Sequence, residues 1–247
     1  MKKFKNFVAR FTRAELILWS LSVFFILAAF VIFDRANYLT LFSSLLAVTS
    51  LIFVAKGDPI GQILLIFFEI FYALISLSYA YYGETITYLF MSLPMSVLSV
   101  ISWLRNPYKG NKQEVKVGKV GKKECFFMLL GALAVAEVFY LILGALGTSN
   151  LVVSTFSVLT SFIAAYLTFR RSPFYALGYA INDIVLVVLW ILATLDDIKY
   201  VSVAVCFAAF FANDLYGFIN WRRMERRQNE NSQKVNIMKE KLKNIPK

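Results

Sequence analysis

The sequence predicts an all-α integral membrane protein with eight transmembrane helices. Of its 247 residues, 59% are hydrophobic and 17% are aromatic, more than a water-soluble domain of this size can bury. A hydrocarbon core about 30 Å thick needs roughly 20 apolar residues for each helical span. The apolar stretches run near 15–33, 37–55, 60–82, 85–104, 124–147, 150–169, 173–195 and 198–221.

The first stretch follows Lys2, Lys3, Lys5, Arg10 and Arg13, as the core of a secretory signal peptide would. It is longer than a signal core and ends at Asp34-Arg35 instead of at a small-residue cleavage site. We therefore interpret it as a transmembrane helix.

The basic residues predict the orientation, because Lys and Arg stay on the cytoplasmic side in short loops. With the N-terminus inside, 24 of the 26 basic residues are cytoplasmic, and only Arg35 and Lys199 lie outside. Both termini are then cytoplasmic. The net charge of +11 is explained without a nucleic-acid partner, and signatures of nucleic-acid-binding folds are missing.

The two halves of the sequence resemble each other. At an offset of 114 the matched pairs are Ser43/Ser157, Leu45/Leu159, Lys56/Arg170, Pro59/Pro173 and Glu69/Asp183, and at 118 Trp103 matches Trp221. Each half reads as a helix, a short basic loop, a proline that starts a second helix, an acid within that helix, a third helix and a closing tryptophan. Proline suits a helix start, where backbone N–H groups lack intrahelical partners.

Because each repeat has three helices, an odd number, a direct fusion would place the second copy upside down in the membrane relative to the first. The helix at 124–147 crosses the membrane once more, so both copies have the same orientation. Two parallel three-helix bundles joined by a linker helix are therefore expected. The expected organisation is 1–36 for the N-terminus and an extra helix, 37–104 for the first bundle, 105–123 for a basic cytoplasmic loop, 124–149 for the linker helix, 150–221 for the second bundle and 222–247 for a cytoplasmic tail.

Four acidic residues lie well inside the spans, where an ionisable group costs roughly 3 kcal/mol even on a lenient insertion scale. Glu69 and Asp183 each follow a proline by ten residues, about 15 Å along a helix, which places both near the midplane. Asp214 is another, and for Glu137 in the linker helix we expect a structural role. Apart from Lys199 at the outer edge of the last span, no Lys or Arg lies within the spans, so these acids need a proton, an external cation or polar neighbours.

Helical spacing places polar and aromatic residues on facing stripes. The stripe at 173–195 includes Tyr175 and Leu186, and the one at 60–82 includes Ser76. The candidate substrate-binding residues are Gln62, Glu69, Tyr72, Tyr179, Asn182, Asp183, Trp190, Asn213 and Asp214. A cavity lined by acids, amides and aromatic rings suits a flat, hydrogen-bonding cation.

Other residues are interpreted more simply. Trp19, Trp103 and Trp221 lie beside inner charges and are expected to be interface-belt residues. Cys125 and Cys206 lie in different helices without metal-type spacing. The absence of histidine excludes His-based catalysis and metal sites. No catalytic residue, metal or cofactor is expected.

Several short motifs carry a resemblance to a known family. They are Ala55-Lys56-Gly57-Asp58-Pro59-Ile60-Gly61-Gln62, Tyr81-Tyr82-Gly83-Glu84, Trp103 with Asn106-Pro107, and Asp214-Leu215-Tyr216-Gly217 with Trp221. In combination they resemble the PnuC vitamin carriers over most of residues 37–223.

The resemblance implies a SWEET-like fold of three, one and three helices, often with an extra N-terminal helix, assembled as a homotrimer in the bacterial inner membrane. It also implies uptake of nicotinamide riboside by facilitated diffusion for NAD biosynthesis, with phosphorylation by a cytoplasmic kinase preventing its return. On this basis we assign Asp183 and Glu69 to the charge or hydroxyls, Asn182, Gln62 and Asn213 to hydrogen bonds, and Trp190 with Tyr179 to the ring.

The sequence departs from the family in one respect. Members that take nicotinamide riboside often carry tryptophans seven and four residues before the asparagine that corresponds to Asn182, where this chain has Tyr175 and Gly178. A related vitamin such as thiamine therefore stays an alternative substrate. Two other classes also stay open: an intramembrane enzyme that uses acidic residues, and a vitamin-binding subunit with an ATP-driven partner.

Overall fold

The computed structural model describes residues 11–78, 81–148 and 150–243, so Lys2, Lys3, Lys5 and Arg10 lie outside the described residues. Within the described part, eight helices are long and apolar enough to cross a membrane, which confirms the predicted fold class. The spans are α2 (Arg13–Phe33), α3 (Tyr38–Ala55), α4 (Pro59–Ser78), the continuous run of α5 (Tyr82–Thr87), η1 (Tyr88–Ser92) and α6 (Leu93–Leu104), then α7 (Lys122–Ala145), α8 (Leu151–Phe169), α9 (Tyr175–Ala193), and η2 (Ile198–Tyr200) with α10 (Val201–Lys243).

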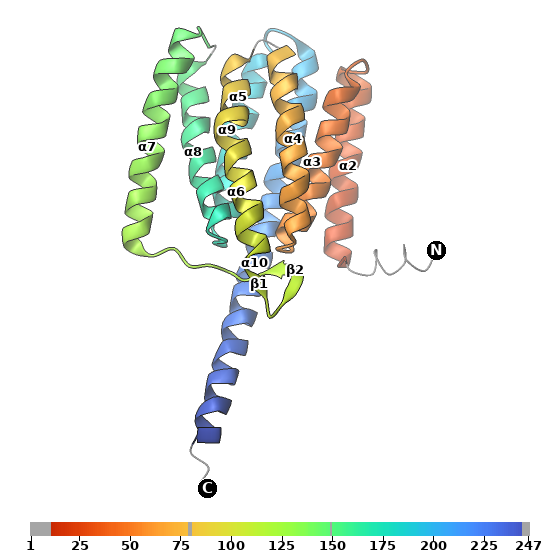
Figure 1. The fold of residues 1–247 in the computed structure, drawn as a ribbon. Coiled ribbons are helices and arrows are strands. Elements are labelled where there is room, and N and C mark those ends of the chain that lie inside the picture. Colours follow the sequence, from red (N-terminus) through yellow and green to blue (C-terminus); the bar gives the residue numbers. More distant parts are fainter. Residues whose placement is uncertain (1–10, 79–80, 149, 244–247) are drawn as a thin grey trace.

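The helices stand side by side, with α7 and α2 at opposite edges (Figure 1). Helix α10 lies centrally, in contact with α9, α3 and α2. In Figure 1, α3 and α8 both run downward and α4 and α9 both run upward, so matched helices of the two halves have the same direction.

Local signals in the sequence explain several helix ends. Thr12 and Glu15 form a capping box at the start of α2, and Asn37 caps α3 by accepting a hydrogen bond from Thr40. Helices α3 and α8 both end in a left-handed residue, Gly57 (φ 71°) and Arg171 (φ 58°), which the offset of 114 pairs. The internal repeat therefore extends to the backbone conformation of these turns.

One end of the bundle carries a β-hairpin formed by β1 (Pro107–Tyr108) and β2 (Asn111–Val115), and we call it the hairpin end and the other the far end. At the hairpin end each half donates two hydrogen bonds to the other. The bonds run from Trp103 Nε1 to Thr168 O (2.9 Å), Ser102 Oγ to Phe169 O (2.8 Å), Trp221 Nε1 to Val54 O (2.9 Å) and Asn220 Nδ2 to Ala55 O (2.8 Å). The donor residues of the two halves correspond at the sequence offset of 118 and the acceptor residues at the offset of 114. The hydrogen bonds between the halves are therefore symmetric.

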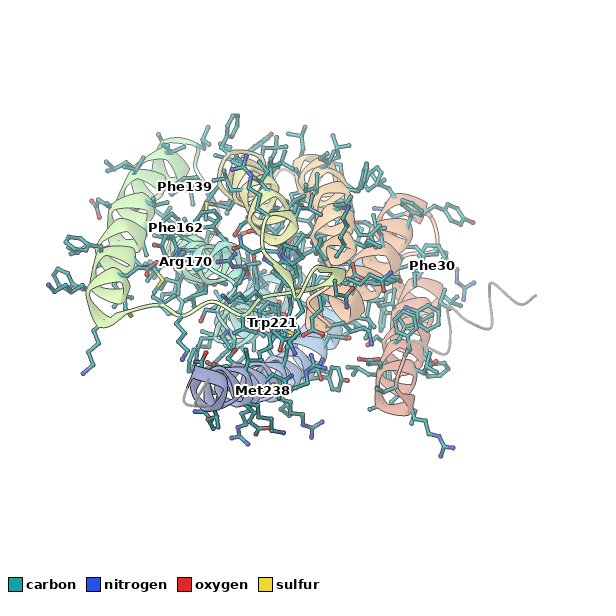
Figure 2. All side chains as sticks on the ribbon, turned by 60° about the horizontal axis from the view of Figure 1, so that its bottom comes forward. Phe30, Phe139, Phe162, Arg170, Trp221 and Met238 are labelled. Carbon is teal, nitrogen blue, oxygen red and sulfur yellow. The ribbon has the colours of Figure 1, made fainter. Side chains whose placement is uncertain are left out.

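The interface-belt interpretation is wrong for two of the three tryptophans. Trp103 and Trp221 are 0% exposed, with ring centroids 5.3 Å apart, and Figure 2, which brings the hairpin end forward, shows Trp221 near the middle of the molecule. Their indole N–H groups bond across the repeats instead of facing the headgroups. Trp19, 38% exposed, donates to Thr49 of the neighbouring helix.

The basic loop expected at 105–123 is an ordered connection between the halves, and we call its residues 105–121, before the start of α7, the strap. Val115 N donates to Gly57 O and Gly118 N donates to Arg171 O, both at 2.9 Å, so the strap holds the matched turn of each half. A Cβ on Gly118 would lie 2.1 Å from Arg170 O, so only glycine fits there. Gln228 of α10 exchanges hydrogen bonds with the strap, and the expected tail is helical as far as Lys243.

The extra helix α2 is attached by buried polar contacts. Glu15 forms an ion pair with Lys56 at 3.1 Å and accepts a hydrogen bond from Tyr216 of α10. Further along α2, Asn213 Nδ2 donates to Ser22 Oγ at 2.9 Å. These contacts fix α2 against both halves of the repeat.

Candidate functional site

A cavity of about 60 Å³ lies between the two halves, and both contribute side chains to its wall. Its polar lining residues are Glu69, Tyr88, Ser92, Ser161, Tyr179, Asn182, Asp183 and Asp214. The lining contains no Lys or Arg among the described residues. Acids of both halves line it, as expected from the matched positions of Glu69 and Asp183 after Pro59 and Pro173, and binding of substrate there stays a prediction.

The acids in the wall face inward. Glu69 is 5% exposed and accepts a hydrogen bond from Ser96 at 2.6 Å, while its other oxygen, Oε2, has no hydrogen-bond partner. Asp183 of α9 and Asp214 of α10 also line the cavity, and Asp183 Oδ2 is buried without a hydrogen-bond partner. Carboxyl groups gathered in one buried wall favour a proton or a cation beside them, so the wall can hold positive charge.

Asn182 is held in a defined orientation. Its amide oxygen accepts hydrogen bonds from Thr160 at 2.8 Å and from Ser161 at 3.0 Å, both on α8. These two donors fix the amide plane beside Asp183, as a recognition group for a hydrogen-bonding ligand requires.

A π-helical turn brings the fourth span into the site. In η1 the N–H of Leu93 bonds to the carbonyl of Tyr88, one residue further back than in an α-helix. Pro94 follows directly and lacks the N–H that an α-helical turn would need. The wider turn accommodates this proline and directs Tyr88 and Ser92 to the cavity.

An aromatic cluster, Tyr72, Tyr81, Tyr88, Trp190 and Tyr200, closes the cavity toward the far end. Trp190 Nε1 donates to Tyr72 Oη at 2.8 Å, and the Trp190 ring lies 4.9 Å from that of Tyr81. Tyr88 connects the cluster to the cavity, since it lines the cavity and its ring lies 4.3 Å from Tyr72. Trp190 is seven residues beyond Asp183, roughly 10 Å along the helix axis.

The nine predicted site residues therefore separate into three groups. The first lines the cavity and comprises Glu69, Tyr179, Asn182, Asp183 and Asp214. Tyr72 and Trp190 belong to the aromatic cluster. Gln62 and Asn213 are buried outside the cavity lining, and Asn213 is bonded to α2 instead.

Sequence reasoning did not include Glu84 among the site residues. Glu84 is 2% exposed and accepts a hydrogen bond from Ser157 of the other half at 3.3 Å. Glu84 lies between the predicted spans 60–82 and 85–104, so it was not counted among the acids within the spans. In the structure Thr85 Oγ1 donates to Ala73 O at 3.3 Å, so this helix begins below the end of α4.

Comparisons with known proteins agree with this architecture. The family model described as "Nicotinamide mononucleotide transporter" matches residues 37–223. The nicotinamide riboside transporter PnuC of Neisseria mucosa is 21% identical over 214 residues, which cover 85% of this chain and 81% of the relative. The solved structure described as "Crystal structure of the Vitamin B3 transporter PnuC" superposes with a TM-score of 0.77 at 19% identity, covering 88% of this chain and 94% of that chain.

The fold and the family match define a multi-pass membrane transporter. The chain belongs to the PnuC family of vitamin transporters. Its relatives are transporters, so its function is transport of a small vitamin-type molecule and not catalysis.

Proposed function

We propose that the protein carries nicotinamide riboside across the inner membrane of a bacterium by facilitated diffusion. The observation that carries this proposal is the cavity between the two halves, lined by Glu69, Asn182 and Asp183 and without a basic side chain among the described residues. Nicotinamide riboside has a charged pyridinium ring, a carboxamide and ribose hydroxyls. Carboxylates and an oriented amide can bind each of these groups.

The two parts of the site have different roles. Tyr179 and Trp190 are eleven residues apart, about 16 Å along the helix, so they cannot both stack on one ring. We place the nicotinamide ring at Trp190 and Tyr72 and the hydroxyl groups at Asp183 and Glu69. The amide oxygen of Asn182 is held by Thr160 and Ser161, so its NH2 group donates to the groups between them.

On this proposal, transport requires the two halves to separate at one end of the bundle and then at the other. Pockets for small molecules usually enclose roughly 300–1,000 Å³, whereas this cavity has about 60 Å³. The reciprocal tryptophan bonds close it at the hairpin end, and the Trp190–Tyr72 bond closes it at the far end. Opening one end while the other stays closed gives access to one side at a time.

We place the hairpin end and both termini in the cytoplasm. The strap and the projecting part of α10 are rich in Lys and Arg, as inner segments are. A cytoplasmic kinase that phosphorylates the substrate would prevent its return and connect uptake to NAD biosynthesis.

We also propose a homotrimer in which α7 contacts a neighbouring copy. Glu137 is exposed on α7 and borders a groove of about 640 Å³ between α7, α8 and α9. An acid facing lipid is costly, and a second copy would cover it. Chemical cross-linking in membranes should give trimers. If only monomers are found after cross-linking, this assembly is contradicted.

The substrate is tested by thermal-shift measurement with nicotinamide riboside, nicotinamide mononucleotide, thiamine and riboflavin. We expect the largest stabilisation from nicotinamide riboside. Thiamine is included because Tyr175, which replaces a family tryptophan, packs 5.0 Å from Trp221 and away from the aromatic cluster. Stabilisation by thiamine alone would reassign the substrate.

A further inference from the structure

The buried carboxyl group of Glu84 is outside the cavity already described. The backbone before it turns back into the bundle, because Tyr81 N donates to Ser76 O at 2.8 Å. Glu84, in the first turn of α5, consequently lies buried among the neighbouring helices. One oxygen accepts from Ser157, and the other, Oε2, is buried without a hydrogen-bond partner.

Aromatic side chains share the helix face of this carboxyl group. Tyr81 and Tyr88 stand three residues before and four residues after Glu84, the spacing of one helical face, and the Tyr88 ring lies 4.3 Å from that of Tyr72. Trp190 packs against Tyr72 and Tyr81 in turn. The site therefore combines a carboxylate oxygen that lacks a partner with several ring faces.

A carboxylate beside aromatic faces is the combination that recognises a flat organic cation, since the charge is attracted both to the anion and to the rings. A neutral ring of the same size would gain only the packing. Leaving one oxygen of a buried carboxylate without a partner is costly, and a cation supplies the missing contact.

We propose that Glu84, with Tyr72, Tyr81 and Trp190, forms a cation subsite that binds the charged ring of the substrate and selects it over neutral rings. The subsite deepens the proposed function and rests on it. Because Trp190 lies about 10 Å from Asp183 along α9, a ligand that joins a ring to a sugar reaches both places. Glu84 comes from the first half and its partner Ser157 from the second, so ring binding bridges the halves.

The test compares two probe compounds that differ mainly in charge: 1-methylnicotinamide, a cation, and nicotinamide, which is neutral. Each competes with nicotinamide riboside for uptake into liposomes that contain the purified full chain. We expect the wild-type protein to prefer the cation by about tenfold or more, and Glu84→Gln to lose that preference. Glu84→Asp, which keeps the charge, should retain most of it.

Glu230→Gln provides the matched control, because Glu230 is an exposed acid on the projecting part of α10, away from the aromatic cluster. Water screens an exposed charge, so the preference should stay unchanged in this variant. If Glu84→Gln elutes and melts like wild type and still prefers the cation, the subsite is refuted while nicotinamide riboside uptake stands. If Glu84→Gln does not fold, the same competition is measured with Tyr81→Leu. An unchanged preference for the cation in Tyr81→Leu then refutes the subsite.

Failure of the proposed function has a different signature. If the wild-type protein takes up no nicotinamide riboside, the assigned substrate is wrong. Direct binding of the two probes to the wild type and to Glu84→Gln then still decides the subsite: equal binding of both probes by the wild type overturns it, and a cation preference lost in Glu84→Gln supports it.

Discussion

At the scale of single residues, Gly57 and Arg171 show how the same turn is built with different side chains. Both adopt the left-handed conformation after matched helices, which costs a residue with a Cβ roughly 1 kcal/mol or more. Arg171 also has two guanidinium nitrogens, Nε and Nη1, buried without hydrogen-bond partners. Burial, and then the nearby charge of Arg170, lower the pKa of Arg171 below its usual value, so its charge is poorly accommodated there.

Arg171→Gly is therefore expected to stabilise the protein by about 1 kcal/mol, a rise of about 3 °C in melting temperature. The reverse change, Gly57→Ala, should lower the melting temperature, because it adds a Cβ at φ 71° that would lie 3.1 Å from Met224. Both are measured by thermal unfolding in detergent. A lower melting temperature for Arg171→Gly would mean that the Arg171 side chain stabilises the protein by more than its left-handed backbone conformation destabilises it.

Asn182 and Asp183 give the second prediction at this scale. Asn182→Ala removes the oriented amide and Asp183→Ala removes a carboxyl group from the cavity wall, so each should weaken substrate binding about tenfold or more with folding retained. Isothermal titration measures the affinity and gel filtration checks the fold. Unchanged affinity in both variants would remove α9 from the binding site.

At the scale of elements, the reciprocal bonds of Trp103 and Trp221 form a closure between the halves. Trp221→Phe and Trp103→Phe keep an aromatic ring and remove the N–H donor, so each should weaken the closure by about 1 kcal/mol. A cysteine introduced at Leu51, which lines the cavity, should then react faster with a polar thiol reagent added from the hairpin side.

Trp19→Phe is the control for this pair, because the Trp19 bond to Thr49 lies outside the repeats' contact. It should leave the reactivity at position 51 unchanged. Equal reactivity in all three variants would show that the tryptophan bonds do not hold the hairpin end closed.

At the scale of the whole molecule, the repeat relates two half-sites around one cavity, and no basic side chain among its described lining residues offsets the acids. If transport is facilitated diffusion, liposomes that contain the purified protein should take up nicotinamide riboside only until its concentration inside equals its concentration outside. A proton or sodium gradient should not raise that plateau, whereas an enclosed kinase with ATP should. Accumulation above the outer concentration without a kinase would indicate ion coupling.

The sequence by itself determined the eight spans, the repeat and the mid-membrane acids, because membrane insertion and helical spacing act locally and leave periodic patterns. From those patterns Glu69 and Asp183 could be placed in one cavity. Only the tertiary structure decided that Asn213 bonds to α2, that Trp103 and Trp221 are buried, and that Glu84 is buried and bonded to Ser157 of the other half. Those placements depend on where a backbone turns back into the bundle and which helix it meets, and such contacts between distant segments leave no spacing in the sequence.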